Sequence, residues 1–180
     1  DQDLRWTLLT QLAVAGGVGE ADIIAELERD PSQAGVEHAL HARAAVPNPS
    51  AKETAWALAI DGDSQTNAAL EALGAGFRRC NDPALLRPFV QRYHDMLEPV
   101  FASRSYALAE RCVKYFYPLD IADANLRDHT GAWLAEHESA PAGLRRLVIE
   151  QLAVVETAVA AQEREARWRH TPWNAAWTGR

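Results

Sequence analysis

The fold class of this chain is decided by residues 82–99, DPALLRPFVQRYHDMLEP. Asp82 can accept a hydrogen bond at a helix start, and Pro83 suits the first helical position because its missing N–H has no partner there. One apolar face then recurs at helical spacing, formed by Leu86, Phe89, Val90, Tyr93 and Leu97. Pro99 is predicted to end the helix. The stretch therefore predicts an amphipathic helix with its own start and stop signals.

The same pattern repeats along the chain, and alternation with a period of two residues is nearly absent. Further apolar faces are predicted from Leu4, Leu8, Leu12 and Ala15; Ile23, Ile24 and Leu27; Ala39, Leu40 and Ala44; Trp56 and Ile60; Leu70, Leu73 and Phe77; Leu108, Cys112, Val113 and Phe116; Leu126, Trp133 and Leu134; and Leu144, Val148, Leu152, Val155 and Val159. The prediction is an all-α chain of about nine antiparallel helices, stacked into a superhelical array like a HEAT or armadillo solenoid.

Helix ends are marked by capping residues, glycines and prolines. Starts are predicted at Asp30-Pro31, at a capping box of Ser50 and Glu53, and at Asp123. Ends are predicted at Gly16-Gly17, Pro47-Asn48-Pro49, Asp61-Gly62-Asp63, Gly74 with Gly76, and Pro118.

Composition and charge narrow the class of partner. The chain has 180 residues, 48% hydrophobic and 24% charged, as in globular proteins that bury a sizeable core. Its net charge of −7 argues against nucleic acid and against a membrane surface as partners, because both attract clustered Lys and Arg. No apolar run approaches the roughly 20 residues of a membrane helix. Cys80 and Cys112, which form no Cys-x-x-Cys pair, predict reduced thiols and a cytoplasmic location.

His38 and His41 are the first candidates for a metal site, because their spacing can place both on one side of a helix. A zinc site also needs a third protein ligand, and neither the His-Glu-x-x-His nor the His-x-x-Glu-His order is present. An ordinary exposed helix face explains the pair better. A small metal enzyme that uses both histidines is kept as an alternative, which zinc analysis of the purified protein would test.

The other reactive side chains lack the neighbours that catalysis needs. Ser103 is not part of a Gly-x-Ser-x-Gly turn and is predicted to cap the following helix. His94, His129 and His137 are scattered, with no carboxylate at a diagnostic spacing. The sequence therefore predicts no catalytic residue and no metal ligand in this chain, and it leaves the substrate-binding residues unknown.

Three blocks of sequence follow one another within residues 1–165. The first comprises Leu27-Glu28-Arg29-Asp30-Pro31-Ser32, Gly35, Ala39, Arg43-Ala44-Ala45-Val46-Pro47, Lys52 and Ala55-Trp56. The second comprises Leu85-Leu86-Arg87-Pro88-Phe89-Val90, Arg92-Tyr93, Pro99, Ser103-Arg104-Ser105 and Phe116-Tyr117-Pro118, and the third is Leu144-Arg145-Arg146-Leu147-Val148 with Glu150. In this order and spacing they resemble the C-terminal helical domain of actinobacterial aminopeptidase N, a gluzincin zinc metallopeptidase.

The resemblance implies a non-catalytic domain that packs over a catalytic domain, encloses a peptide-binding chamber and restricts access to the active site. The parent reaction would be hydrolysis of N-terminal amino acids from peptides, with the zinc in the catalytic domain and no cofactor in this segment. The implied partners are that catalytic domain and peptide substrates. Arg87, Arg92 and Arg104 are candidates for chamber-lining arginines, although a solvated helix surface explains each equally well. The alternative function is a free-standing α-solenoid adaptor for a protein or peptide, and a reading frame that begins near Asp1 would favour it.

Residues 166–180 depart from the resemblance and carry Trp168, Trp173 and Trp177. We predict a domain over 1–165 and, over 166–180, a Trp-rich tail that is loose or non-native, with a docking segment as the alternative. Because the chain opens at Asp1 directly on an amphipathic pattern, it is expected to be a piece of a longer protein, inactive alone. Trp6 near that end and the Trp-rich tail predict an exposed apolar face and self-association.

Overall fold

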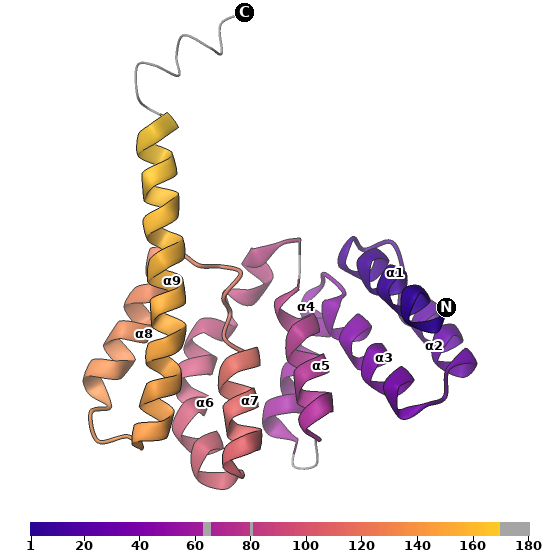
Figure 1. Ribbon diagram of the computed structural model, residues 1–180, viewed down its shortest axis with the longest axis horizontal. Coiled ribbons are helices and arrows are strands. Elements are labelled where there is room, and N and C mark those ends of the chain that lie inside the picture. Colours follow the sequence, from indigo (N-terminus) through magenta and orange to yellow (C-terminus); the bar gives the residue numbers. More distant parts are fainter. Residues whose placement is uncertain (63–65, 80, 170–180) are drawn as a thin grey trace, which may run out of the picture.

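The computed structural model describes residues 1–62, 66–79 and 81–169, and every regular element among them is helical (Figure 1). This described part contains nine α-helices: α1 (Gln2–Val14), α2 (Glu20–Arg29), α3 (Gln33–Ala45), α4 (Pro49–Trp56), α5 (Asn67–Arg78), α6 (Phe89–Ser103), α7 (Tyr106–Tyr115), α8 (Ala124–Glu136) and α9 (Ala142–Arg169). A π-helical turn, η1 (Ala57–Asp61), continues α4, and a 3-10 turn, η2 (Pro83–Leu86), precedes α6. The predicted all-α class is confirmed.

The helices follow one another along the molecule, from α1 and α2 at one end to α8 and α9 at the other (Figure 1). α3 packs against α1 and α5, and α7 packs against α5 and α9. The odd-numbered helices therefore form a continuous row. The even-numbered helices pack onto this row, with α2 on α3, α4 on α3 and α5, α6 on α7, and α8 on α9. The interpretation of the array as a HEAT-like superhelix goes beyond these contacts and remains a prediction.

Most of the array shares one apolar core, which we call the large core and which extends from Ala44 in α3 to Val159 in α9. Its centre is an aromatic cluster in which the paired ring centroids lie 4.9–6.0 Å apart, formed by Trp56, Phe77, Phe89 and Phe116. The apolar face predicted from residues 82–99 lies within this core, as do Cys112, Val113 and Phe116. The small core is separate. It joins α1 and α2 to α3 and consists of Trp6, Ile23, Ala39 and Ala42.

Gly74 and Gly76 do not end a helix, contrary to the prediction, because α5 continues to Arg78. A Cβ atom on Gly76 would lie 2.2 Å from the carbonyl oxygen of His41 in α3. A Cβ atom on Gly74 would lie 2.4 Å from Cβ of Tyr115 in α7. Both glycines are therefore needed for close approach, and they let α5 contact its two neighbours in the row on opposite sides.

Several predicted helix ends are wrong. α4 begins at Pro49, two residues earlier than a helix capped by Ser50 would begin, because Asn48 caps it and accepts from the Ala51 N–H at 2.8 Å. α7 is capped by Ser105 rather than Ser103. Pro99 lies inside α6, which runs on to Ser103, and Val100 beyond it is buried in the large core. Burial of this last turn offsets the backbone hydrogen bond that proline removes.

The start predicted at Asp30-Pro31 is also displaced, since Ser32 caps α3 and accepts from the Gly35 N–H. Asp30 has a different role, described below. The predicted caps Asp82 and Asp123 are confirmed, and they accept from the N–H groups of Ala84 and Leu126. Asp82 caps the turn η2 and not α6 itself.

The side of α1 that was predicted to be buried is exposed to solvent. Leu4, Leu8 and Leu12 are 55%, 55% and 50% exposed. The buried side of α1 carries Trp6, Thr10, Ala13 and Val14. α1 thus has apolar side chains on two opposite sides, and helical spacing alone cannot tell which side faces inward.

The predicted division between 1–165 and 166–180 falls inside α9, which continues to Arg169 without a break (Figure 1). Trp168 lies on this helix and is exposed. Trp173 and Trp177 lie outside the described residues.

Candidate functional site

A polar hollow lined by histidines lies between α6 and α8 and has a volume of about 470 Å³. Its walls carry three histidines and three carboxylates: His94, His129 and His137 with Asp95, Glu98 and Glu136. Sequence reasoning treated these histidines as scattered. They come together because α6 and α8 pack against each other, which their spacing along the chain does not reveal.

His94 is the buried member of this group, and both of its ring nitrogens are occupied. Nδ1 lies 2.8 Å from the Val90 carbonyl oxygen and therefore carries a proton, since a carbonyl can only accept. Nε2 lies 3.1 Å from the Thr130 hydroxyl, which also contacts Tyr117 Oη at 2.8 Å. Burial lowers the pKa of His94. The ring is thus an internal part of the packing, with both nitrogens in contact with protein atoms.

His137 and His129 are held more loosely. The His137 ring stacks on Trp133 with centroids 4.5 Å apart, and its Nδ1 lies 2.9 Å from the Trp133 carbonyl oxygen. Its Nε2 lies 3.8 Å from a carboxylate oxygen of Glu98. The His129 ring stacks over His94 at 6.1 Å. Each histidine therefore has a partner within its own helix or in the helix opposite.

The candidate pair His38 and His41 do not form a site together. His38 stacks on the Trp6 indole at 5.7 Å, which ties α3 to α1. His41 points inward, its Nε2 is buried without a hydrogen-bond partner, and burial, followed by the charge of Arg79, lowers its pKa. Within residues 1–62, 66–79 and 81–169, no three His, Cys, Asp or Glu side chains lie close enough together to hold a metal ion.

The three candidate arginines are engaged in contacts within the array. Arg87 pairs with Asp123 at 2.8 Å. Arg92 pairs with Glu53 at 2.8 Å and lies over the rings of Trp56 and Phe89. The two ion pairs join segments that are distant in sequence, Arg87 to the start of α8 and Arg92 to α4, so both guanidinium groups help to hold the array together.

Arg104 makes the most contacts of the three. Its guanidinium donates to the carbonyl oxygens of Ala59, Ile60 and Gly62 at 2.7–2.9 Å and to the Cys112 Sγ at 3.0 Å. It thereby satisfies the carbonyl groups at the end of η1, which have no partner within that turn. Ser103 beside it donates its hydroxyl proton to the Pro99 carbonyl oxygen at 2.8 Å and has no base beside it among the contacts of the described residues.

Cys112 is fully buried, and burial raises the pKa of its thiol, as expected of an inert core cysteine. Cys80 lies outside the described residues.

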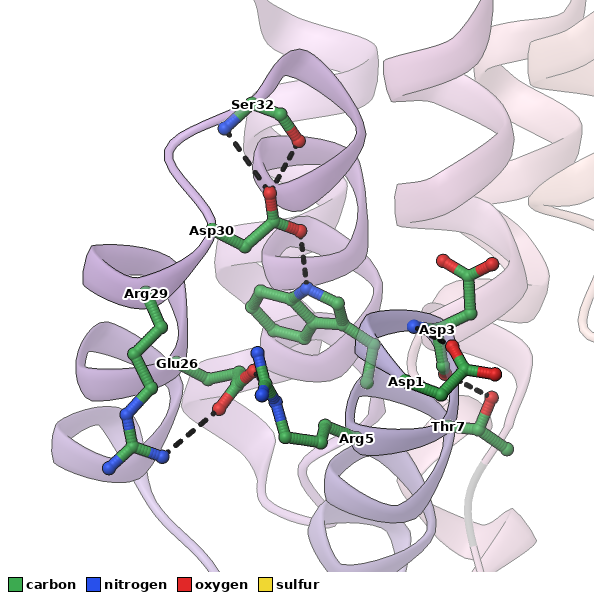
Figure 2. Close-up of polar contacts among 9 residues, drawn as sticks. Asp1, Asp3, Arg5, Thr7, Glu26, Arg29, Asp30 and Ser32 are labelled. Atoms are coloured by element: carbon green, nitrogen blue, oxygen red, sulfur yellow. Dashed lines mark hydrogen bonds and ion pairs between the residues drawn. The ribbon is translucent and has the colours of Figure 1, made fainter.

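Two polar networks at the start of the chain were missed by sequence reasoning. The Trp6 indole N–H donates to Asp30 Oδ2 at 2.8 Å, and Ser32 donates to Oδ1 of the same carboxylate (Figure 2). Hydrogen bonds from Ser32 and then from Trp6 lower the pKa of Asp30. The only signal in the sequence was Asp30-Pro31, which also fits a helix cap.

The second network centres on the buried carboxylate of Glu26 in α2. It accepts from Arg5 of α1 at 2.7 Å and pairs with Arg29 at 3.4 Å (Figure 2). Together the two networks fasten α1 to α2 and to the turn before α3. Both networks stabilise the packing of these helices.

A buried lysine performs a similar role at the junction of α3, α4 and α5. Lys52 is fully buried, and its ammonium group donates to the carbonyl oxygens of Ala44 at 2.6 Å and Gly76 at 3.2 Å. A charge can be buried only where such partners replace water. Lys52 therefore joins the backbone of α3 to the backbone of α5.

Beside this junction lies an apolar hollow of about 340 Å³. It is lined mainly by side chains of α3, α4 and the residues that follow each of them, among them Leu40, Val46, Ala55 and Leu58. Its rim carries the ion pair of Glu20 and Arg43 at 2.7 Å. The hollow offers mainly apolar contact, and its lining also includes the hydroxyl-bearing residues Ser50 and Thr54.

None of the helices in the described part is both long enough and apolar enough to cross a membrane.

Comparison with known proteins gives these features a context. Residues 1–157 match the family model of the ERAP1-like C-terminal domain. The chain is 40% identical over 166 residues to aminopeptidase N of Streptomyces lividans, and this match covers 92% of the chain. It covers only 19% of that protein, so the chain spans about a fifth of the length of the curated relative.

Proposed function

The chain belongs to the family of ERAP1-like C-terminal domains, and from that membership we propose that it serves an aminopeptidase N-like protein as a non-catalytic wall around its active site. In this role it encloses the peptide-binding chamber and restricts the access of large substrates to a separate catalytic domain. The resemblance seen in the sequence to the C-terminal domain of an actinobacterial aminopeptidase N is confirmed.

One observation carries the proposal: the similarity covers 92% of this chain but 19% of the relative. A segment with this coverage is one structural part of an aminopeptidase and not its whole machinery. The polar groups of the described residues support this view, because Arg104, Lys52 and Asp30 all bind backbone or structural side chains of the array. In the whole protein, a zinc ion in the catalytic domain would activate the water that releases an N-terminal amino acid. A cytoplasmic location is part of the same proposal.

The first test uses the chain alone. With zinc added, the purified chain is expected to show no hydrolysis of aminoacyl-anilides. Turnover that a chelator abolishes would contradict a non-catalytic role and would require a site that the described residues do not contain. The Streptomyces lividans aminopeptidase N, assayed in the same buffer, is the positive control.

The second test addresses access. In that aminopeptidase, the matching segment is replaced by this chain in one protein and deleted in another. The replacement is expected to retain the parent's low ratio of unfolded-polypeptide to anilide hydrolysis, whereas the deletion raises the ratio because large substrates reach the site. Equal ratios in all three enzymes would show that the segment does not control access and would favour the adaptor alternative.

A further inference from the structure

The apolar hollow beside Lys52, which we call the α3–α4 hollow, is lined by small side chains from both of these helices. They are Ala44 of α3 and Ala51 and Ala55 of α4, and Leu73 of α5 lines the hollow as well. Ala44, Ala55 and Leu73 are at most 2% exposed and belong to the large core, so the hollow reaches inward as far as that core. Its volume of about 340 Å³ lies in the range of about 300–1,000 Å³ that is usual for small-molecule sites.

The rim of the hollow carries one charge of each sign. Glu20 begins α2 and Arg43 lies in the last turn of α3, and both residues line the hollow. Two nitrogens of the Arg43 guanidinium meet Oε1 of Glu20, Nε at 2.8 Å and Nη2 at 2.7 Å. The third nitrogen, Nη1, makes no hydrogen bond within residues 1–62, 66–79 and 81–169. The rim therefore offers a donor and an acceptor side by side.

This combination of floor and rim selects the chemistry of a ligand. The apolar floor favours an aliphatic or aromatic side chain, because such a group leaves water when it enters. A ligand with only a carboxylate would be repelled by Glu20, and a ligand with only an ammonium group would be repelled by Arg43. A zwitterion that lies antiparallel to the ion pair avoids both repulsions, with its ammonium against Glu20 and its carboxylate against Nη1 of Arg43. Because the two rim groups are in direct contact, the two charges of the ligand must be close together, as they are in an α-amino acid.

Two other hollows of the array differ from this one. The hollow between α6 and α8 is lined by three carboxylates and by no lysine or arginine. The hollow beside η1 and α6 is lined by Arg104, whose guanidinium is already bound to the carbonyl oxygens of Ala59 and Ile60. The α3–α4 hollow, in contrast, combines an apolar floor with a charge of each sign at its rim.

We propose that the α3–α4 hollow binds a free α-amino acid with a large apolar side chain, such as leucine or phenylalanine. The side chain enters among Leu40, Val46 and Leu58, while the ammonium and carboxylate groups stay at the rim. Such an amino acid belongs to the class of products that an aminopeptidase releases, and this link to the reaction rests on the proposed function. The binding itself does not, because it is measured on the chain alone and without turnover. A failure of binding therefore leaves the tests of access unaffected, and the reverse also holds.

The experiment follows the amide NMR resonances of the purified chain while L-phenylalanine is added. We expect saturable shifts at Leu40, Ala55 and Leu58, which line the hollow. The expected dissociation constant is on the order of 1 mM, which corresponds to about twelve non-hydrogen atoms with a modest binding energy each. Three related compounds define the recognition: 3-phenylpropionate lacks the ammonium group, phenethylamine lacks the carboxylate, and N-acetyl-phenylalanine amide carries neither charge. Each is expected to bind at least about tenfold more weakly, because it loses one or both charged hydrogen bonds.

Two variants test the rim. Glu20→Gln should weaken the binding of L-phenylalanine at least about tenfold but should not weaken that of 3-phenylpropionate, since it removes the repulsion of the carboxylate. Arg43→Gln should likewise weaken the binding of L-phenylalanine but not that of phenethylamine. The matched control is Arg111→Gln, which breaks an ion pair with Glu71 at 2.6 Å between α7 and α5 and should leave the affinity unchanged.

A third variant tests the floor. Ala51→Leu places a larger apolar side chain in the hollow and should abolish the binding of L-phenylalanine. The melting temperature of this variant should stay the same or rise, because filling an apolar space commonly stabilises a protein. Loss of binding in a folded variant then reports on the space itself.

Shifts that do not saturate, or binding that Ala51→Leu leaves intact, would overturn the proposal. Equal affinity for N-acetyl-phenylalanine amide would assign the hollow to a side chain within a polypeptide, and equal affinity for either singly charged compound would show that the rim recognises only one charge. Both outcomes would also overturn it. Selective binding of L-phenylalanine that both rim variants weaken and Ala51→Leu abolishes, and that Arg111→Gln leaves intact, would support it.

Discussion

The large core and the small core hold their helices by different means. In the large core, α4, α5, α6 and the C-terminal end of α7 meet through a cluster of aromatic rings centred on Phe77. In the small core, one indole is surrounded by Ile23 and two alanines, and its polar edge is held by the Asp30 carboxylate. Stabilisation by apolar burial grows with the area removed from water, whereas hydrogen bonds add about 1 kcal/mol each and depend on geometry. The helices α1 and α2 are therefore expected to form the weaker end of the array.

The largest effect should come from removing one ring in each core. Phe77→Ala is expected to lower the free energy of unfolding of the whole array by about 3–5 kcal/mol, as measured by urea unfolding. Trp6→Ala removes an equally buried ring, but its effect should be concentrated in α1 and α2, where amide exchange accelerates far more than in α5 to α7. If Trp6→Ala accelerated exchange equally in α5 to α7, the two cores would unfold as one unit and the comparison would fail.

The next effect tests the contact between α3 and α5, where the two cores adjoin. Gly76→Ala would place a Cβ atom 2.2 Å from the His41 carbonyl oxygen, so α3 and α5 must move apart. Overpacking of this kind is expected to cost about 3 kcal/mol in urea unfolding. The control is Gly131→Ala in α8, where nothing lies within 4 Å of the added atom. It should stabilise the chain by up to about 1 kcal/mol through helix propensity, so an equal response to both substitutions would contradict the close contact.

A smaller effect is expected in the pH dependence of the free energy of unfolding. Here a histidine packed in the large core can be compared with one beside the small core. Burial lowers the pKa of His94 and, with Arg79, of His41, below the ordinary value of about 6.5. The unfolded chain then binds more protons than the folded chain below that pH. The free energy of unfolding should be constant above about pH 6.5 and should fall as the pH is lowered, by at most about 1.4 kcal/mol per pH unit for each histidine.

Urea unfolding at pH 7.5, 6.5 and 5.5 measures this slope. His94→Gln should flatten it, and His41→Gln should flatten it separately. His137→Gln is the control, because its ring lies in the same hollow and stacks on Trp133 instead of on His94. A slope that neither His94→Gln nor His41→Gln changes would show that both histidines titrate normally in the folded chain.

The sequence predicted the large core better than the small one, for a physical reason. Phe89, Tyr93 and Leu97 lie on a helix with one apolar side, so helical spacing is enough to orient it. α1 has Trp6 on one side and Leu8 on the other, and only the neighbouring helix decides which is buried. The orientation of α1 is a property of the packed array and not of its own sequence.

Polar groups were harder to predict than apolar ones. Lys52 resembles a surface lysine in the sequence, yet the carbonyl groups of Ala44 and Gly76 make its burial possible. The histidines His94, His129 and His137 are far apart in the chain and gather only because α6 packs on α8. Residue spacing predicts which side chains share one face of a helix, but it does not predict which helices pack against each other.

The smallest expected effect concerns the carboxylate that closes the small core. Ser32→Ala removes the hydrogen bond that contributes most to the lowered pKa of Asp30, so this pKa should rise toward its ordinary value of about 3.9 in an NMR titration. Trp6→Phe keeps most of the apolar ring but removes the indole N–H, and it should raise the pKa by less, because Trp6 is the second contributor. Since the folded pKa is lowered, the ionised carboxylate stabilises α1 and α2 above about pH 3.9, and this contribution is lost as the pH falls through the folded value. Amide exchange of α1 should therefore accelerate in acid before that of α5, and both substitutions should reduce the difference. If the Asp30 pKa moved in neither variant, the carboxylate would not hold the indole, and the small core would depend on apolar contact as the large core does.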